Sequence, residues 1–384
     1  MTRNSTVNII FVIGILLYSS CIETYVPQID MKDQTKYVIS GNITNQEGYQ
    51  TVTISLTSPV SAPEFIPVTG CQVTIFDGLG NEFVLTETND GVYRVWITKE
   101  FLIPGTSYQL NVITPDGINF ISDYDKMPEC PELDSIYYVK EDAPLEYTDP
   151  NFETTEGIQF YVDFSGTDND SRFLRWEITE TWEYHTQFIL SAVIDNRGFH
   201  YVEEDSSKLV CWRTQNSKEI FSLSTNNLSQ NMYRKFPLNY VNNHTARLAY
   251  GYYLVVKQHA LSENAFDYWE QLRLVSNNEG GLYETQPFSV EGNIHNITNP
   301  DKEVLGFFEA SSVDSLKLFI TRVDNLTLDY NTYCTYFIPV RWPRYSSVNV
   351  YITDISGRNY EMNLQCWDCL SRGGINIKPD FWPL

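Results

Sequence analysis

The sequence predicts a mainly β protein, with an N-terminal immunoglobulin-like β-sandwich followed by a larger β-rich domain that carries one amphipathic helix. Three observations support this fold class. The chain is rich in aromatic residues, with Tyr 26, Phe 21 and Trp 8, and aromatic side chains favour pleated, half-buried surfaces. Short segments alternate apolar with polar residues. Long helical periodicity is nearly absent, and 384 residues are too many for one simple core, so we expect two domains.

Residues 1–20 have the pattern of a lipoprotein signal peptide. Arg3 supplies the positive charge, and the segment Val7–Tyr18 is apolar except for Asn8 and Gly14. As a helix this segment would span about 18 Å, well short of the roughly 30 Å hydrocarbon core of a bilayer. The pattern therefore favours a cleaved signal over a membrane span.

Two small residues, Ser19 and Ser20, stand directly before Cys21, as a lipoprotein signal peptidase requires. Cleavage would leave Cys21 at the N-terminus with its sulfur linked to diacylglycerol, and two or three acyl chains anchor a protein firmly. Tyr18 stands where this motif more often has Leu. A plain secretory signal with an incidental Cys21 and an uncleaved transmembrane helix are the alternatives. Residues 21–35 would form an acylated, polar tether.

The formal net charge of −23 limits the partners that this protein can have. Nucleic acids and anionic lipids both need a cationic surface, so we expect neither to bind. After residue 21 no segment is long and apolar enough to span a bilayer. The charge suits a soluble body that a lipid holds at a membrane.

Residues 36–126 are predicted to form the sandwich. Polar or glycine-bearing turns such as "DGLGN" and "TPDG" separate short strands at a spacing of roughly ten residues. The alternation in "CQVTIFD" and "YQLNVIT" predicts one buried and one solvated face. The expected strands are Tyr37–Ile43, Thr51–Leu56, Cys71–Asp77, Glu82–Thr86, Gly91–Ile97, Ser107–Thr114 and Asn119–Ser122.

Residues 127–384 are predicted to form the larger domain, since "MPECPELDS" (127–135) has two prolines and no strand pattern. Its clearest strand is "RFLRWEITETWEYHTQF", which we interpret as sandwich core rather than a carbohydrate-stacking platform. A carboxylate on its aromatic face, Glu180, must be paired, hydrogen-bonded or at the sheet edge. Arg175 lies on the opposite face, so another strand must supply the partner. The aromatic face comprises Leu174, Trp176, Ile178, Glu180, Trp182 and Tyr184.

One segment, "SENAFDYWEQLRLVSN", predicts a helix. Ser262 suits the N-cap position and Glu263 the first turn. Phe266 and Trp269 begin an apolar stripe at helical spacing. We expect this helix to plug one end of a β-structure, and a partner-binding helix is the alternative. At the C-terminus, Phe381 and Trp382 are expected to dock onto the body.

Six cysteines follow Cys21, and an even number in an exported chain permits up to three disulfides in 15 connectivities. Cys366 and Cys369 form a CxxC motif, which can also be half a zinc site or a redox pair. No second CxxC or HxxxH exists, and the motif precedes a Gly-Gly turn. We therefore favour structural disulfides, although Cys71 suits a buried thiol. The candidates are Cys71, Cys130, Cys211, Cys334, Cys366 and Cys369.

Signals for catalysis are weak, so we expect no enzyme, no metal and no cofactor. The sequence has no G-x-S-x-G, H-E-x-x-H or phosphate loop. The acidic pair in "VEED" (202–205) could serve a glycosidase, but we interpret it as a solvated loop. No metal-ligand spacing relates the five histidines, which are His185, His200, His244, His259 and His295.

Several motifs occur in a characteristic order: "SGNIT", "PGTSYQLNVITPDG", "WEITETWEY", "LVVKQHALSENAFDYWEQL", "GGLYETQPFSVEGNIHNITNP" and "CWDCLSRGG". Together they resemble the Bacteroidetes outer-membrane lipoprotein family catalogued as domain of unknown function 4249. The resemblance covers nearly the whole mature chain and is most specific over residues 254–311. Cys71 and Cys130 fall where this family's pattern has other residues, so a bond between them would be peculiar to this chain.

The resemblance implies a lipid-anchored accessory subunit of a TonB-dependent outer-membrane transporter, acting in ligand capture or as a lid, at the cell surface or the periplasmic face. It implies no catalytic residues. The alternatives are a structural or assembly lipoprotein that binds a protein partner, and a secreted hydrolase. A pocket between the domains lined by aromatics such as Trp212 or Tyr283 would favour ligand capture, and a flat apolar patch would favour a protein partner.

Overall fold

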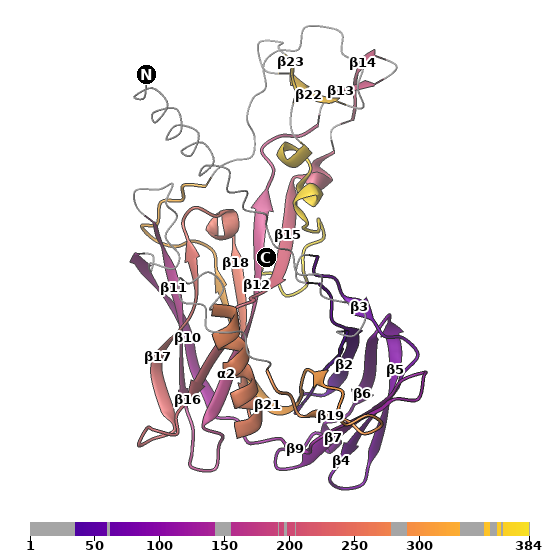
Figure 1. Ribbon diagram of the computed structural model, residues 1–384. Coiled ribbons are helices and arrows are strands. Elements are labelled where there is room, and N and C mark those ends of the chain that lie inside the picture. Colours follow the sequence, from indigo (N-terminus) through magenta and orange to yellow (C-terminus); the bar gives the residue numbers. More distant parts are fainter. Residues whose placement is uncertain are drawn as a thin grey trace, which may run out of the picture.

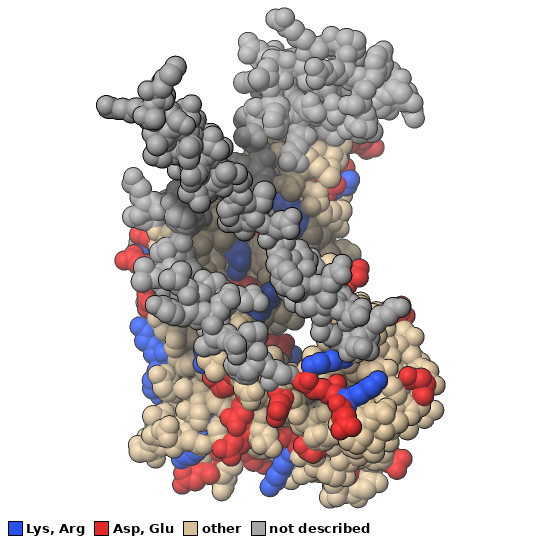
Figure 2. Space-filling view, in the orientation of Figure 1, with Lys and Arg blue, Asp and Glu red and all other residues tan. Residues whose placement is uncertain are grey.

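The computed structural model shows a mainly β protein with sandwich-like sheets and a single α-helix in its described part, which confirms the predicted fold class (Figure 1). In that part no helix is long and apolar enough to cross a membrane. Acidic side chains gather across the lower part of the described surface (Figure 2). The residues described are 35–59, 62–142, 155–190, 192–195, 198–203, 205–277, 290–330, 349–353, 359–361 and 364–383.

The first domain contains all seven strands that alternation predicted. They pair in the order β1-β2-β6-β5-β4-β7-β8 around a core that includes Ile54, Ile75 and Tyr108. Tight turns with glycine at positive φ, such as Gly117, connect the hairpins. The strands are β1 (Tyr37–Thr44), β2 (Gly48–Leu56), β3 (Ile66–Pro67), β4 (Gln72–Asp77), β5 (Glu82–Asn89), β6 (Val92–Ile97), β7 (Ser107–Ile113), β8 (Asn119–Ser122) and β9 (Asp125–Lys126).

A later segment of the chain returns to this first domain, so a single boundary at residue 127 is incomplete. Strand β19 (Ile294–Asn296) pairs with β8, and β20 (Val304–Leu305) pairs in parallel with β1. The first residues of β21 (Phe308–Ile320) also pair with β1. Side chains of these three strands pack into the hydrophobic core of the first domain. The alternation within residues 36–126 did not indicate that this core needed further strands.

The second domain stacks two sheets. One has the order β10-β11-β17, and the other runs β15-β12-β18-β21 with β16 paired to β12. Aromatic pairs join the two sheets, with Phe160 stacked on Tyr252 at 5.5 Å and Trp176 on Phe236 at 4.3 Å between ring centroids. The strands are β10 (Glu132–Asp142), β11 (Glu156–Ser165), β12 (Phe173–His185), β15 (Val210–Asn216), β16 (Phe221–Ser224), β17 (Met232–Asn242) and β18 (Tyr252–Ala260).

Smaller elements complete the described fold. A separate four-stranded sheet has the order β14-β13-β22-β23, and its strands are β13 (Ala192–Asp195), β14 (Gly198–Tyr201), β22 (Asn349–Thr353) and β23 (Asn359–Glu361). The α-helix is α2 (Glu263–Asn277). The 3-10 turns are η2 (Lys99–Phe101), η4 (Ser206–Lys208), η5 (Ala246–Leu248), η6 (Leu364–Cys366) and η7 (Cys369–Arg372).

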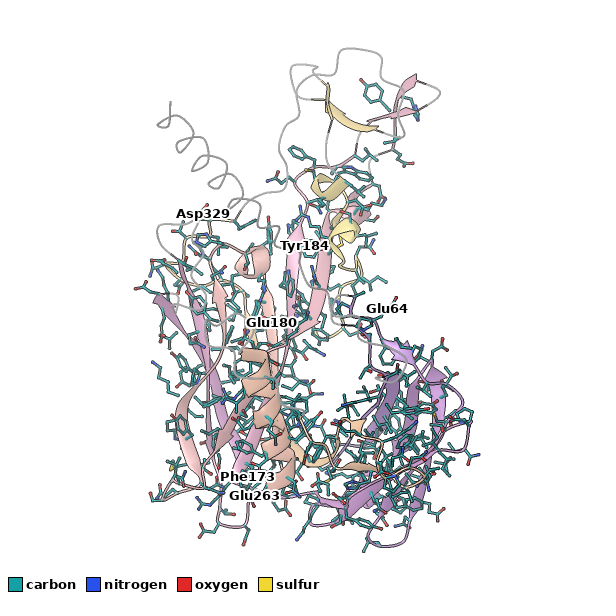
Figure 3. The ribbon with its side chains drawn as sticks, in the orientation of Figure 1. Glu64, Phe173, Glu180, Tyr184, Glu263 and Asp329 are labelled. Carbon is teal, nitrogen blue, oxygen red and sulfur yellow. A yellow bond between two sulfur atoms is a disulfide. The ribbon has the colours of Figure 1, made fainter. Side chains whose placement is uncertain are left out.

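Glu180 lies inside the second domain, as its place on the aromatic face of β12 predicted (Figure 3). Its carboxylate accepts hydrogen bonds from Arg247 Nη1 at 3.2 Å, from Asn239 Nδ2 at 3.1 Å and from the Tyr252 hydroxyl. Strands supply Asn239 and Tyr252. The cationic partner, Arg247, comes from the 3-10 turn η5 and not from a strand as expected. A long arginine side chain on a turn can reach a buried carboxylate from outside the sheet.

Only some of the cysteines predicted to form disulfides do so. Cys211 bonds to Cys369 across a sequence separation of 158 residues, and Cys366 is also disulfide-bonded. The two cysteines of the CxxC motif are therefore not bonded to each other. Cys71 and Cys130 are both free thiols, so the disulfide expected at Cys130 was wrong. At Cys71 the thiol alternative holds, although the residue is only half-buried.

The surroundings of the free thiols explain why they are not joined. Cys71 Sγ faces the Val68 carbonyl oxygen in the first domain. Cys130 Sγ lies 3.6 Å from the Gln258 carbonyl oxygen of β18 in the second domain. Cys21 and Cys334 lie outside the described residues.

Candidate functional site

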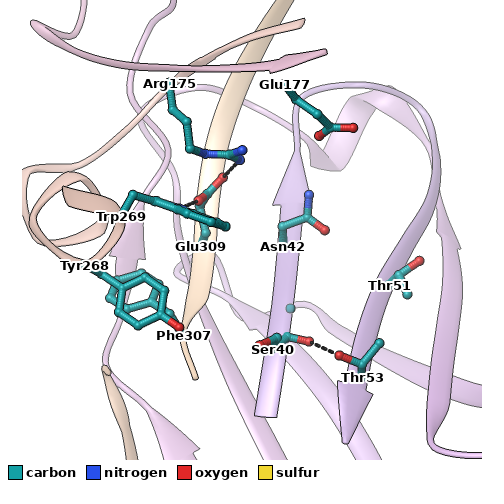
Figure 4. Close-up of a pocket in the computed structure, with 11 residues that line it drawn as sticks. Ser40, Asn42, Thr51, Thr53, Arg175, Glu177, Tyr268, Trp269, Phe307 and Glu309 are labelled. Atoms are coloured by element: carbon teal, nitrogen blue, oxygen red, sulfur yellow. Dashed lines mark hydrogen bonds and ion pairs between the residues drawn. The ribbon is translucent and has the colours of Figure 1, made fainter. Parts of the chain in front are cut away.

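Strand β21 is shared by both domains and exchanges one partner for another along its length. Residues 308–311 pair in parallel with β1, and residues 312–320 pair antiparallel with β18. A pocket of about 310 Å³ lies beside this exchange point, between α2, β12 and β21 on one side and β1 and β2 on the other (Figure 4). This volume is at the lower end of the range for small-molecule sites.

Helix α2 forms the aromatic wall of the pocket. Ser262 Oγ accepts a hydrogen bond from the Ala265 amide at 3.2 Å, which confirms the predicted N-cap. The helix packs against β12 and β16 instead of closing one end of a sheet as expected. Tyr268 stacks on Phe307 with 4.8 Å between ring centroids, and Trp269 projects beside them toward β1 (Figure 4).

Two charged groups hold the Trp269 indole in place. Its Nε1 donates to Glu309 Oε2 at 2.6 Å, and the Arg175 guanidinium lies 4.2 Å from the ring centroid. Arg175 Nη2 is also 3.4 Å from Glu309 Oε1. Burial alone would raise the pKa of Glu309, but Arg175 and His259 hold it below its usual value. The indole is thus fixed by a cation–π contact and a charge-assisted hydrogen bond.

His259 links the two carboxylates of the pocket. Its Nε2 lies 3.6 Å from Glu177 Oε2, and its Nδ1 lies 3.7 Å from Glu309 Oε1 and 3.0 Å from Ser311 Oγ. Burial, followed by the nearby Arg175, lowers the pKa of His259. A neutral ring with its hydrogen on Nε2 accepts a hydrogen bond from Ser311 Oγ at Nδ1, whereas Nε2 is buried and makes no hydrogen bond to the described residues. The contact with His259 lowers the pKa of Glu177 to about 2.

The opposite wall is a grid of four small polar side chains. The register of β1 and β2 places Ser40 opposite Thr53 and Asn42 opposite Thr51. The Thr53 hydroxyl donates to the Ser40 carbonyl at 3.3 Å. The side chains of Ser40, Asn42 and Thr51 make no hydrogen bond to any other described residue. Their hydroxyl and amide groups are therefore available to a ligand.

Glycine at position 41 allows this wall to form. A Cβ there would lie 2.8 Å from Val52 Cγ2 and 3.2 Å from Phe308 Cδ2. Gly41 therefore lets β1 lie close to both β2 and β21, where a larger residue would separate the strands.

The pocket supplies groups for binding more readily than groups for hydrolysis. A glycosidase keeps one carboxylic acid protonated by raising its pKa, whereas the pKa values of both Glu177 and Glu309 are lowered. Among the described residues no group of His, Cys, Asp and Glu could hold a metal ion.

Trp212, one of the two aromatic residues suggested for a pocket, does not line this one. Trp212 is buried against the C-terminal tail, where its backbone pairs with Ile375 and its ring meets Trp382 at 6.4 Å. Trp382 packs as expected, and Phe381 stacks on Tyr253 at 4.8 Å. Tyr283 lies outside the described residues.

The adjacent aromatic residues Tyr268 and Trp269 are a sequence signal for this pocket that was not recognised. Adjacent residues of a helix point about 100° apart, so Tyr268 and Trp269 cannot both lie along the centre of one apolar stripe. A wide aromatic pair of this kind suggests a second contact surface beside the core.

The fold therefore consists of two β-rich units that share strand β21, with a mixed aromatic and polar pocket where that strand changes partner. The chain belongs to the family described as "Domain of unknown function (DUF4249)", whose model matches residues 22–317. This confirms the resemblance found in the sequence.

Other comparisons add little. No curated protein matches the chain. A solved structure, trypsin-activated alpha-2-macroglobulin from Escherichia coli, is similar at 12% identity with a TM-score of 0.18. The match covers 60% of this chain and 15% of that one, and it carries no weight here.

Proposed function

We propose that this protein is an outer-membrane lipoprotein that captures a ligand as an accessory or lid subunit of a TonB-dependent transporter. The pocket between the two domains is the observation that carries the proposal. Its lining combines an aromatic wall with unpaired hydroxyl and amide groups, as small-molecule sites do. A ligand bound there would contact both domains at once.

The N-terminal sequence supports the proposed address. The apolar leader ends at Cys21, and the family match begins at residue 22, directly after it. The acidic surface (Figure 2) gives no electrostatic attraction to anionic lipid, so acylation of Cys21 would supply the membrane attachment.

A structural or assembly role is the second candidate. Tyr49 and Trp96 are 65% and 53% exposed on the first domain and lie edge to face at 5.1 Å. An exposed aromatic pair suits contact with a protein. Hydrolysis is less well supported, because both carboxylates of the pocket favour the ionised state.

Cell fractionation tests the membrane anchor. The wild-type chain should sediment with the outer membrane, and Cys21→Ala should move to the soluble fraction. A Ser20→Ala variant keeps a small residue before Cys21 and serves as the control. Retention of Cys21→Ala in the membrane would overturn the lipoprotein proposal.

Affinity purification tests the transporter. The tagged chain, extracted from the outer membrane in detergent, should recover a β-barrel protein at a fixed stoichiometry. Recovery of the chain alone in repeated, cross-linked preparations would overturn the accessory role. Equal recovery of the barrel by Asn42→Ala and Trp96→Phe would show that the barrel contacts neither site, which leaves the pocket free for a ligand as proposed.

A further inference from the structure

The geometry points to a neutral saccharide of roughly one or two rings as the ligand of the pocket between α2 and β1. This inference rests on the proposed ligand-capture function and names the chemical class that the pocket would select. Three features carry it: the aromatic wall, the polar grid that faces it, and the charge of the lining.

The two walls match the two kinds of surface on a sugar ring. One face of a pyranose presents C–H groups, which favour the electron-rich face of an aromatic ring. Tyr268 and Trp269 carry such rings on α2, and Glu309 fixes the indole of Trp269. Phe307 covers one face of the Tyr268 ring and Arg175 one face of the indole, so a sugar can use only the opposite face of each. A preorganised ring loses little conformational entropy when a ligand binds.

The polar grid matches the hydroxyl groups along a sugar's edge. Hydroxyl groups that leave water need new hydrogen-bond partners, because an unsatisfied buried polar group is costly. Ser40 and Thr51 can each donate and accept, and the Asn42 amide offers both donors and an acceptor. Neighbouring positions on the paired strands β1 and β2 lie about 5 Å apart, a spacing suited to groups on one small ring.

The charge of the lining disfavours acidic ligands. Arg175 is the cation of the pocket, and Glu309 already pairs with it at 3.4 Å. With Glu177 and Glu309 ionised, the lining carries one positive and two negative charges, which sum to −1. Within the lining, which does not include Arg94 opposite Thr51 on β6, a carboxylate or phosphate would meet this charge without an unpaired cation. A neutral sugar should therefore bind better than its acidic counterpart.

Isothermal titration calorimetry with the lipidated full chain tests the inference. The detergent must have no sugar head group. The probes are maltose, lactose and cellobiose as neutral disaccharides, with glucose and glucuronate as a pair that differs by one carboxylate. A glycyl-leucine dipeptide represents a different ligand class. We expect at least one neutral disaccharide to bind, and glucose to bind at least about tenfold more tightly than glucuronate.

Variants locate the site. Asn42→Ala alters an exposed side chain, so it should fold normally and weaken sugar binding about tenfold, and Thr51→Val should weaken it about fivefold. Val84→Ala, which shortens an exposed side chain of β5 outside the pocket, is the matched control and should leave the affinity unchanged. Circular dichroism and thermal unfolding check that each variant is folded.

Three results would overturn the inference: no binding of any sugar in the panel, tighter binding of glucuronate or the dipeptide, or loss of sugar binding in Val84→Ala with retention in Asn42→Ala. These failures differ from failure of the proposed function. A chain that binds no sugar but recovers the β-barrel keeps its accessory role, with a ligand of another class.

Discussion

The two domains differ in how far along the chain most of their strand pairs reach, although β19, β20 and the start of β21 return to the first domain from a distant part of the sequence. In the first domain, pairs such as β4–β5 and β7–β8 are hairpins between sequence neighbours. In the second, β11 pairs with β17 and β12 with β18, and the Cys211–Cys369 bond spans 158 residues. Short-range pairing leaves a clear pattern in the sequence, and long-range pairing leaves only the apolar faces of isolated strands.

Their buried polar groups differ in the same way. Asp77 in the first domain accepts hydrogen bonds from the amides of Leu79 and Asn81, within its own turn. Glu180 and Glu309 in the second domain depend on partners from distant elements. Local polar groups shape turns, whereas the distant networks determine how sheets and the helix pack, and one of them borders the pocket.

The largest expected effect comes from the Cys211–Cys369 disulfide. Replacing both Cys211 and Cys369 by alanine should lower the free energy of unfolding by about 4 kcal/mol, since the bond closes a long loop in the unfolded chain. Guanidinium unfolding followed by tryptophan fluorescence measures this in a Trp96→Phe background, which removes the tryptophan of the first domain. Cys71→Ala, at a free thiol, is the control. An equal loss in that control would remove the contrast between the domains.

Glu180 should have the next largest effect. Glu180→Ala leaves Arg247, Asn239 and Tyr252 without their shared acceptor and should cost about 3 kcal/mol of unfolding free energy. Urea denaturation measures the loss. Glu82→Ala, at an exposed position of β5, should change stability by less than about 0.5 kcal/mol. Similar losses for both variants would show that the buried network has no special role.

Asp125 tests the junction between the domains, because its carboxylate is buried and accepts a hydrogen bond from the Ala310 amide of β21 at 2.8 Å. Burial raises its pKa from 3.8 to about 6. The folded carboxyl therefore holds its proton more tightly than the unfolded one. The free energy of unfolding falls as the pH rises from 3.8 through about 6, because the buried carboxylate must ionise. Asp125→Asn keeps the acceptor and should gain about 2 kcal/mol at pH 7.

That gain should shrink as the pH falls and vanish below the unfolded value of 3.8. Thermal unfolding of both proteins from pH 4 to 8 measures the difference. A gain that is independent of pH would show that charge is not its cause.

The smallest effect concerns His259 beside the pocket. Because its pKa is lowered in the folded state, the unfolded chain binds a proton more readily as the pH falls below 6.5. Stability should therefore fall as the pH decreases below that value. The measurement needs the Asp125→Asn background, since Asp125 acts in the opposite direction. His259→Gln should abolish the slope, whereas His295→Gln, at a 54% exposed side chain, should retain it.

Sequence patterns predicted the elements better than the site. Period-two alternation located β4, β7 and β12, and the N-cap at Ser262 with its apolar stripe located α2, because these signals depend on neighbouring residues. They also showed that Glu180 needed a partner. They could not show that Arg247 would supply it, since a turn residue has no periodicity relative to a distant strand.

By itself, the sequence determined the mainly β fold class, the strands of the first domain, the helix and the acidic charge. Each follows from composition or from residues a few positions apart. Only the tertiary structure decided that β21 joins both domains and that Tyr268 and Trp269 face Asn42 and Thr51 across a pocket. That arrangement depends on contacts between segments more than 200 residues apart, where chain geometry and packing, rather than local preference, determine which side chains meet.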